Sequence, residues 1–325
     1  MKKNQLVSFF IKAIKFIAVF LLIDFSLGAV AKYLFFHQSS GKYARITYSL
    51  EKVNADVLIF GSSHANRHYV PAIFEKKLKL SCYNAGVQGQ QILFHSAMEQ
   101  IIVNRIKPKI IVLNIDENWL FQSKESYDRL ADLHPYYSNY SNVIRPILNL
   151  KSKFDYLILF IKSYKFNSTI VHIIKYFFQP QLSQKGYNPL YGKLSTPKFK
   201  ATQQNIKQNT DTVKKPIDIN FVNALYKFIE IATKNNIKLF FVASPTINGI
   251  QIKNESNDMI KEIIKKSRVP FIEFSSNENF IGKYELFNDA SHLNNDGAIL
   301  FSSLLSDSIY NRINAGNLLA NGHKE

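Results

Sequence analysis

The chain has 325 residues, of which 46% are hydrophobic, so it can build a substantial core and is not globally disordered. Its formal net charge of +17 is typical of proteins that meet nucleic acid, an anionic membrane surface or an anionic polymer. The single cysteine, Cys82, excludes an intrachain disulfide but leaves the compartment open.

The N-terminal segment predicts a membrane anchor. Met1 to Lys15 carries four lysines and no acid, and the apolar run after it continues past Asp24 as far as Ala31. Counted from Val7, the segment reaches the roughly 20 residues that cross a bilayer. The lysines place its N-terminal end in the cytoplasm. We therefore expect a single-pass protein of the bacterial cytoplasmic membrane, with the remainder outside, in the periplasm or beyond it.

Two features of this segment leave alternatives open. Ala29-Val30-Ala31 has the A-x-A pattern of a signal-peptide cleavage site, so a removed signal peptide is the rival interpretation. Apolar residues continue beyond that site, which favours an anchor. Asp24 is unusual, because a carboxylate near the middle of a span costs about 2.5–3.5 kcal/mol. It is either tolerated in a single span or contacts another membrane helix.

Beyond the anchor at residues 1–36, residues 37–54 are polar and predict a linker. Strand and helix patterns then alternate over residues 55–313, and a polar tail covers 314–325. The predicted strands are Ala55–Phe60, Leu80–Tyr83, Lys109–Leu113, Lys238–Ala243 and Phe271–Phe274. The predicted helices are Pro71–Leu78, Gln90–Ile106, Phe221–Asn236, Asp258–Ser267 and Asp296–Ile313. This alternation predicts an α/β fold with a doubly wound parallel sheet, a three-layer sandwich of the flavodoxin type.

A long insertion, about 120–216, interrupts the alternation. It is mostly helical in expectation, with helix candidates at Phe154–Phe166 and Ile170–Phe178. Lys151 to Lys215 contains twelve lysines and two carboxylates, a net charge of +10. A basic insertion is most often solvated, but this one could also rest on anionic head groups near the anchor or bind an acidic glycan.

Chemistry-bearing residues gather where the predicted strands end, and open α/β sheets bind ligands at that edge. Four clusters follow in order: Ser63 after the first strand, Gly86 after the second, Asn114 with Asp116 and Asn118 after the third, and Asp289 with His292 before the last helix. A serine hydroxyl becomes a nucleophile when a neighbouring base takes its proton. A histidine held by an aspartate is such a base.

This ordered set resembles the SGNH, or GDSL-type, hydrolase superfamily over about 55–120 and 220–313. The matching stretches are Gly61-Ser62-Ser63, with Ser62 where the family has Asp, then Asn84-Ala-Gly86-Val-Gln-Gly89, and Asp289-x-x-His292. The resemblance implies a triad of Ser63, His292 and Asp289. It also implies an oxyanion hole that includes the N–H groups of Ser63 and Gly86.

The third cluster departs from the family, because Asp116 stands where the family has Asn. An ionised Asp would repel an oxyanion, whereas an amide donor stabilises one by on the order of 3–4 kcal/mol. Either Asn118, which we favour, or Asn114 supplies the third donor, or the hole has two donors, or activity is weakened or lost. Asp116 would instead orient the loop or a substrate hydroxyl.

His64 and Arg67 flank the serine. Together with Asp116 they are the candidate substrate-binding residues, Arg67 for an anionic group; the alternative is that they are loop residues without contact to substrate. His68 is interpreted in the same way as His64. No spacing of His, Cys and Asp predicts a metal site, and no cofactor is expected.

The whole layout resembles membrane-anchored envelope proteins, such as the D-alanyl transfer protein of teichoic acid synthesis and O-acetylation factors of bacterial polysaccharides. That resemblance implies a serine esterase or O-acyltransferase acting on an envelope polysaccharide. The partners would be an acylated glycan or acyl donor and a membrane acyltransferase. Nucleic acid is not expected outside the cell. The alternative is a non-catalytic glycan-binding or assembly subunit of a polysaccharide modification or export complex.

Overall fold

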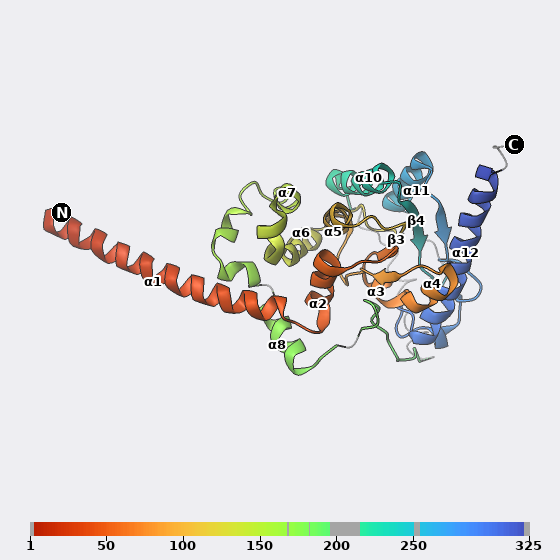
Figure 1. The fold of residues 1–325 in the computed structure, drawn as a ribbon, viewed down its shortest axis with the longest axis horizontal. Coiled ribbons are helices and arrows are strands. Elements are labelled where there is room, and N and C mark those ends of the chain that lie inside the picture. Colours follow the sequence, from red (N-terminus) through yellow and green to blue (C-terminus); the bar gives the residue numbers. More distant parts are fainter. Residues whose placement is uncertain (1–2, 168, 182, 196–214, 250–253, 322–325) are drawn as a thin grey trace. The chain divides into compact units, whose positions relative to one another are not determined.

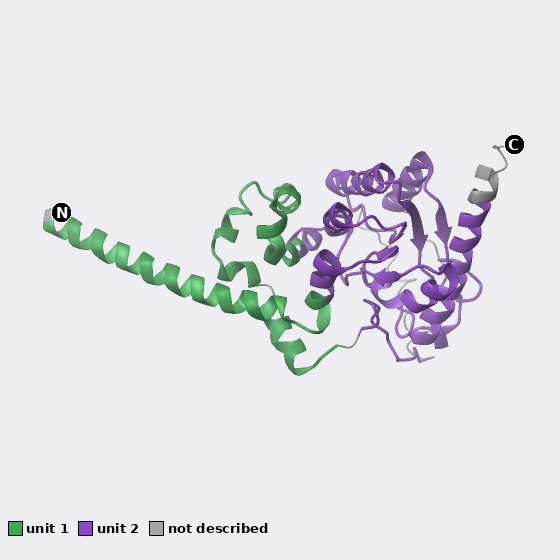
Figure 2. Ribbon diagram, viewed as in Figure 1, with its two compact units in different colours: residues 1–44, 130–181 green, residues 45–129, 182–325 purple. Residues whose placement is uncertain are grey.

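The computed structural model describes residues 3–167, 169–181, 183–195, 215–249 and 254–321. The chain forms two compact units (Figure 2). Unit 1 comprises residues 1–44 and 130–181, and unit 2 comprises residues 45–129 and 182–325.

Unit 2 contains a five-stranded parallel sheet (Figure 1), which confirms the predicted fold class. Its strands are β1 (Val57–Phe60), β2 (Cys82–Asn84), β3 (Ile110–Asn114), β4 (Lys238–Ala243) and β5 (Phe271–Glu273). They lie in the order β2-β1-β3-β4-β5, and every neighbouring pair is parallel. The chain therefore starts in the interior of the sheet and winds outward in both directions, the arrangement that the sequence predicts.

Helices cover both faces of this sheet. Those of unit 2 are α2 (Gly41–Thr47), which begins in unit 1, α3 (Ser63–His68), α4 (Pro71–Leu78), α5 (Ile92–Arg105), α6 (Lys124–Asp128), α10 (Ile219–Lys234), α11 (Glu255–Ser267) and α12 (Asn295–Asn321), with the short turns η1 (Tyr48–Lys52) and η5 (Tyr284–Leu286). Helix α12 packs against α3 and α4, and α5 packs against α10.

Side chains alternate between the two faces along each strand. Val57 and Ile59 of β1 belong to the same core cluster as Phe301 of α12. Phe60 instead points to the other face, where its ring lies 5.5 Å from that of Phe228 in α10. All five side chains of β3 are buried, and the four apolar residues at 110–113 predict this for a strand covered on both sides. Burial of each such large side chain stabilises the fold by about 1.5–3 kcal/mol.

Two predicted boundaries differ from the structure. Residues 37–54 were expected to form a polar linker, yet α2 and η1 occupy most of this segment, and Ile46 and Leu50 are fully buried. The reason is a helical spacing of apolar residues, Tyr43, Ile46, Leu50 and Val53, within a polar composition. At the other end, α12 continues through Asn321, so the helix extends into the expected tail.

Unit 1 is helical over most of its described residues. It contains α1 (Lys3–Phe36), η2 (Arg129–Tyr136, whose first residue belongs to unit 2), α7 (Tyr137–Leu148), η3 (Leu157–Phe160), η4 (Ser163–Phe166) and α8 (Ile170–Phe178). The single helix expected over Phe154–Phe166 is divided into the two short turns η3 and η4. Among the described residues, one helix is long and apolar enough to cross a membrane: Asn4–Phe36, in which an 18-residue window reaches a mean hydropathy of 2.4.

The turn between β1 and α3 requires glycine, and this gives a stability prediction. Gly61 has φ +139°, and a Cβ there would lie 2.8 Å from the backbone oxygen of Asn114. We expect Gly61→Ala to lower the free energy of unfolding by about 3 kcal/mol or more, through backbone strain and this clash. Gly282→Ala is the matched control: its φ of +72° is also positive, but its Cβ would meet nothing within 4 Å, so about 1 kcal/mol is expected.

The measurement is denaturant unfolding of the detergent-solubilised full chain, followed by the fluorescence of Trp119, the only tryptophan. Equal losses for the two variants would show that the close approach to Asn114 does not restrict this turn.

Candidate active site

Ser63 lies at the carboxyl end of β1. The strand ends at Phe60, Gly61 makes the turn, and Ser63 is the first residue of α3. Ser62 is the N-cap residue of this helix, but its hydroxyl does not cap it. Ser62 is buried and Ser63 is partly exposed. Of the two serines, Ser63 is therefore the one with access to solvent.

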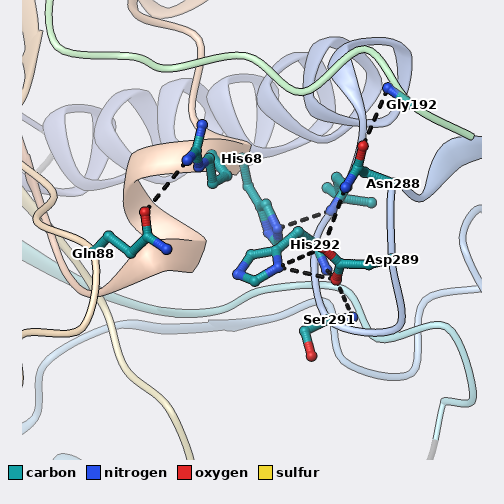
Figure 3. Close-up of polar contacts among 9 residues, drawn as sticks. His68, Gln88, Gly192, Asn288, Asp289, Ser291 and His292 are labelled. Carbon is teal, nitrogen blue, oxygen red and sulfur yellow. Dashed lines mark hydrogen bonds and ion pairs between the residues drawn. The ribbon is translucent and has the colours of Figure 1, made fainter. Parts of the chain in front are cut away.

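Asp289 and His292 form the second half of the predicted triad. His292 Nδ1 lies 3.0 and 3.1 Å from the two carboxylate oxygens of Asp289 (Figure 3). The backbone N–H groups of Ser291 and His292 also donate to Asp289 Oδ1, each at 2.9 Å. Burial alone would raise the pKa of Asp289, but the bonds from His292 and Ser291 outweigh it and hold that pKa well below its usual value. The carboxylate is thus fixed, charged and directed at the imidazole.

The other nitrogen of His292 has no partner. Its Nε2 is buried, and within the described part of the chain it makes no hydrogen bond. Figure 3 shows the ring with one nitrogen turned to Asp289 and the other directed away from it. No hydrogen bond joins Ser63 Oγ to His292 among the described residues. Of the two contacts that the predicted triad requires, the structure therefore contains the one between Asp289 and His292 and, among the described residues, lacks the one between Ser63 and His292.

Asp116 accepts four hydrogen bonds. Ser62 Oγ and Trp119 Nε1 donate to Oδ2, at 2.7 and 3.1 Å. His64 Nδ1 and Asn114 Nδ2 lie 2.6 and 3.0 Å from Oδ1. Burial acts to raise the pKa of Asp116, but the charge and hydrogen bond of His64, with the other donors, lower it overall. The carboxylate therefore holds the two residues on either side of Ser63.

This contact also links the two departures from the family pattern. The resemblance implies Asp at position 62 and Asn at position 116, whereas this chain has Ser62 and Asp116. Ser62 donates its hydroxyl hydrogen to Asp116. The two residues that depart from the predicted pattern are therefore hydrogen-bonded to each other.

His64 pairs with Asp116 and lies beside the catalytic candidates. Burial disfavours its charged form, but Asp116 and the backbone of Ser291 outweigh this and raise the pKa of His64. Its ring centroid is 5.6 Å from that of His292 and 5.0 Å from that of His68. The predicted contact of His64 and Asp116 with substrate stays a prediction; in this state both are engaged with protein groups.

The oxyanion candidates differ in how far they are already engaged. The Gly86 N–H donates to Asn84 Oδ1 at 2.9 Å. Asn118 Oδ1 accepts from Asn254 at 3.0 Å. Asn114 is fully buried and, besides its bond to Asp116, accepts from Tyr69 at 2.7 Å and Ser244 at 2.5 Å. Asn114 is thus occupied on both ends of its amide, which leaves Asn118 as the better candidate for a third donor.

A cavity of about 270 Å³ opens beside the serines. Its lining includes Ser63, Gln91, Asn118, Glu125 and Arg129, and His292 is not part of it. Most of the lining residues carry hydroxyl, amide or charged groups, while Trp119, Gly89 and the carbon atoms of the other side chains make nearly half of the lining surface apolar. Such a lining suits a hydroxyl-rich ligand better than a long alkyl chain.

Arg67 and His68 connect α3 to neighbouring loops. Arg67 donates to the backbone oxygen of Asn188 at 2.9 Å and to Gln88 at 3.3 Å, and its proposed contact with an anionic group is untested. His68 is buried, and its Nε2 accepts the backbone N–H of Leu293 at 3.0 Å. Burial, together with the nearby charge of His64, lowers the pKa of His68 well below its usual value, so it is a neutral acceptor. It holds the chain directly after His292.

Sequence reasoning missed several supporting residues. Trp119 and Ser244 bond to Asp116 and Asn114, and His68, interpreted from the sequence as a substrate contact or a loop residue, accepts the backbone N–H of Leu293. Ser244 follows β4 directly, so the strand-end rule could have found it. Within the described ranges, no group of three or more His, Cys, Asp or Glu side chains could hold a metal ion.

No family model and no curated protein matches this chain. Among solved structures, it is similar to a lipolytic protein of the G-D-S-L family from Desulfitobacterium hafniense, at 11% identity and a TM-score of 0.38, over 78% of this chain and 99% of the other. It is also similar to an acetyl xylan esterase, at 13% identity and a TM-score of 0.36, over 79% of this chain and 99% of the other.

The His64–Asp116 pair predicts a pH-dependent stability. The folded-state pKa of His64 is raised, so its contribution is full below the unfolded value of about 6.5 and disappears as pH rises through the folded pKa. The folded-state pKa of Asp116 is lowered, so its contribution is present above about 3.9 and disappears as pH falls through the folded value. We expect His64→Asn to cost about 1–3 kcal/mol near pH 5–6 and clearly less above pH 8.

The measurement is the free energy of unfolding of wild type and His64→Asn from pH 5 to 9, followed by Trp119 fluorescence. In an Asp116→Asn background this pH dependence should be lost or reversed, because burial, which lowers the pKa of His64, is then no longer offset by Asp116. A cost that does not change with pH in the wild-type background would contradict a charged pair.

Proposed function

We propose that the chain is a membrane-anchored serine esterase or O-acyltransferase that acts on a cell-envelope polysaccharide. Ser63 is the nucleophile, His292 the general base and Asp289 the residue that orients it. The observation that carries the proposal is the Asp289–His292 pair, with a buried Nε2 that has no hydrogen-bond partner in the described structure. A base held on one side by a carboxylate and open on the other suits proton abstraction from a serine.

The reaction proceeds in two steps. Ser63 Oγ attacks the acyl carbon while its proton passes to His292 Nε2, and Asp289 stabilises the imidazolium. The tetrahedral oxyanion then collapses, and the leaving alkoxide takes the proton from His292. In the second step, water or a glycan hydroxyl attacks the acyl-serine with His292 again as base. Water leads to hydrolysis and a glycan hydroxyl to transfer.

Three donors serve the oxyanion in this proposal: the N–H groups of Ser63 and Gly86 and the amide of Asn118. The Gly86 N–H would have to leave Asn84, so substrate binding includes a small change in that turn. Each donor contributes on the order of 3–4 kcal/mol to the transition state. Asp116 takes no direct part in binding the oxyanion, because its charge is balanced by His64 and its oxygens already accept hydrogen bonds.

The substrate and the location rest on two features. The polar cavity beside Ser63 favours a hydroxyl-rich acyl acceptor or an acylated glycan. Helix α1 is the proposed anchor, with its lysine-rich N-terminus in the cytoplasm and the catalytic unit outside. The proposed partners are an acyl donor or acylated glycan and a membrane acyltransferase, without a cofactor and without nucleic acid.

A second candidate is a non-catalytic glycan-binding or assembly subunit. Two observations favour it: no hydrogen bond joins Ser63 to His292 among the described residues, and the Gly86 N–H is bonded to Asn84. Neither the predicted triad nor the predicted oxyanion hole is therefore complete in this structure. A binding subunit would still use the polar cavity.

The two candidates differ in the reactivity of Ser63. We expect a fluorophosphonate probe to label the detergent-solubilised wild type, and labelling rates to fall at least 10³-fold in Ser63→Ala and His292→Ala. Ser62→Ala is the matched control: it removes the neighbouring hydroxyl and one bond to Asp116, so labelling should continue at a reduced rate. Labelling is measured by in-gel fluorescence over time.

Absence of labelling in a wild type with native Trp119 fluorescence would favour the binding subunit. Labelling that persists in Ser63→Ala but is lost in Ser62→Ala would reassign the nucleophile to Ser62.

A further inference from the structure

Helix α1 carries one carboxylate, and the structure shows which groups donate hydrogen bonds to it. Asp24 is the only acidic residue of α1 and is buried. It accepts the backbone N–H groups of Lys162 and Ser163, at 2.8 and 2.9 Å, and the hydroxyl hydrogen of Ser163, at 2.6 Å. These donors belong to the start of η4, in the insertion. Asp24 is therefore buried, and its hydrogen bonds hold the start of η4 against α1.

The contact extends along one face of α1. Gly28 lies one turn after Asp24, and a Cβ there would come within 2.5 Å of Lys162 Cβ. Phe25 lies under the Lys162 ammonium group, 3.7 Å from the ring centroid. Further along, the ring of Phe35 is 5.5 Å from that of Phe166. Gly28, Asp24 and Phe35 therefore lie on the face of α1 that meets η4.

The part of the insertion beside α1 exposes many large apolar side chains. Phe154, Phe160, Val171, Phe177 and Phe178 are each at least 70% exposed. Leu157, Ile158, Ile161, Ile170 and Ile174 are exposed to a lesser degree. Soluble proteins rarely expose so many large apolar groups in one short segment, so this surface needs a cover.

The position of Asp24 in α1 indicates what surrounds these exposed apolar side chains. Asp24 lies midway between Lys15 and Lys32, in the apolar stretch proposed to cross the bilayer. Residues that bond to it must therefore lie at membrane depth. Backbone that is not a long helix is tolerated there when its polar groups are satisfied by protein, and Asp24 satisfies Lys162 and Ser163.

We infer that residues 154–167 and 169–178 enter the lipid bilayer beside α1 as a re-entrant segment, with their exposed aromatic and aliphatic side chains among the acyl chains. The inference rests on the anchor in the proposed function but not on the catalytic serine. It also requires that α1 is retained, because cleavage after Ala31 would remove Asp24 and Gly28 and strand Ser163 at this surface. The exposed face of this segment would then be continuous with the lipid-facing side of α1.

The test uses single-cysteine labels on the full chain. Cys82 is buried and burial raises the pKa of its thiol well above the usual value, so the native cysteine stays unlabelled. Phe160→Cys and Phe177→Cys report on the segment, and Leu22→Cys reports on α1. Ile219→Cys is the matched control, because Ile219 is an apolar residue of unit 2 that is 65% exposed, beside 78% for Phe160 and 76% for Phe177.

Each variant is labelled with bimane and reconstituted into phosphatidylcholine–phosphatidylglycerol vesicles with nitroxide-labelled acyl chains. We expect quenching at positions 160, 177 and 22 at least two-fold stronger than at position 219. The intact mass of protein purified from membranes should include residues 1–31. Trp119 fluorescence checks that each variant is folded.

Two results would overturn the inference, and one of them would also overturn the proposed membrane anchor. Quenching at 22 with none at 160 and 177 would place the segment outside the lipid and make it a surface for another membrane protein. No quenching at 22, or an N-terminus at Lys32, would also remove the anchor from the proposed function. Neither result depends on fluorophosphonate labelling of Ser63, so a failure of this inference is distinguishable from a failure of the catalytic assignment.

Discussion

The site of unit 2 depends on one carboxylate at the end of β3. Asp116 is held by Ser62, His64, Asn114 and Trp119. A charge withdrawn from water must be paired and hydrogen-bonded, and these donors meet that need. Since Ser62 and His64 flank Ser63, the same bonds fix the backbone on both sides of the candidate nucleophile. The end of β3 therefore determines where the first turn of α3 lies.

Much of this could be predicted from the sequence. Apolar strands, each followed by a helix pattern, indicated the parallel sheet, and Asp289-x-x-His292 indicated the Asp–His pair that the structure contains. The bonding of Asp116 could not be predicted, because its donors come from separate strand ends and helices whose approach no local pattern encodes. An Asp in place of Asn suggested a weakened oxyanion hole, and only the contact with Ser62 reveals a complementary pair. The linker prediction failed for a simpler reason, since composition hid the spacing of Tyr43, Ile46 and Leu50.

Asp24 in unit 1 follows the same rule as Asp116. In both places a carboxylate occupies a position where its charge is costly, and neighbouring segments supply the compensating donors. The consequence differs with the donors. Asp116 is bonded by side chains, which orient a small site, whereas Asp24 binds the backbone start of η4 and so fixes a whole segment against α1. An acidic residue in an apolar helix therefore indicates that another segment donates hydrogen bonds to it, because its burial without them would cost free energy.

The arrangement of charges bears on how His292 works. The proposed role of His292 as a base requires a transient positive charge, and the ring of His64, whose pKa Asp116 raises, lies 5.6 Å away. Two unit charges at that distance repel by about 3 kcal/mol at an effective dielectric constant of 20. Asp116 and Asp289 each lie against one of the two rings and offset that repulsion. Each of the two neighbouring imidazoles is therefore held by its own carboxylate, Asp116 for His64 and Asp289 for His292.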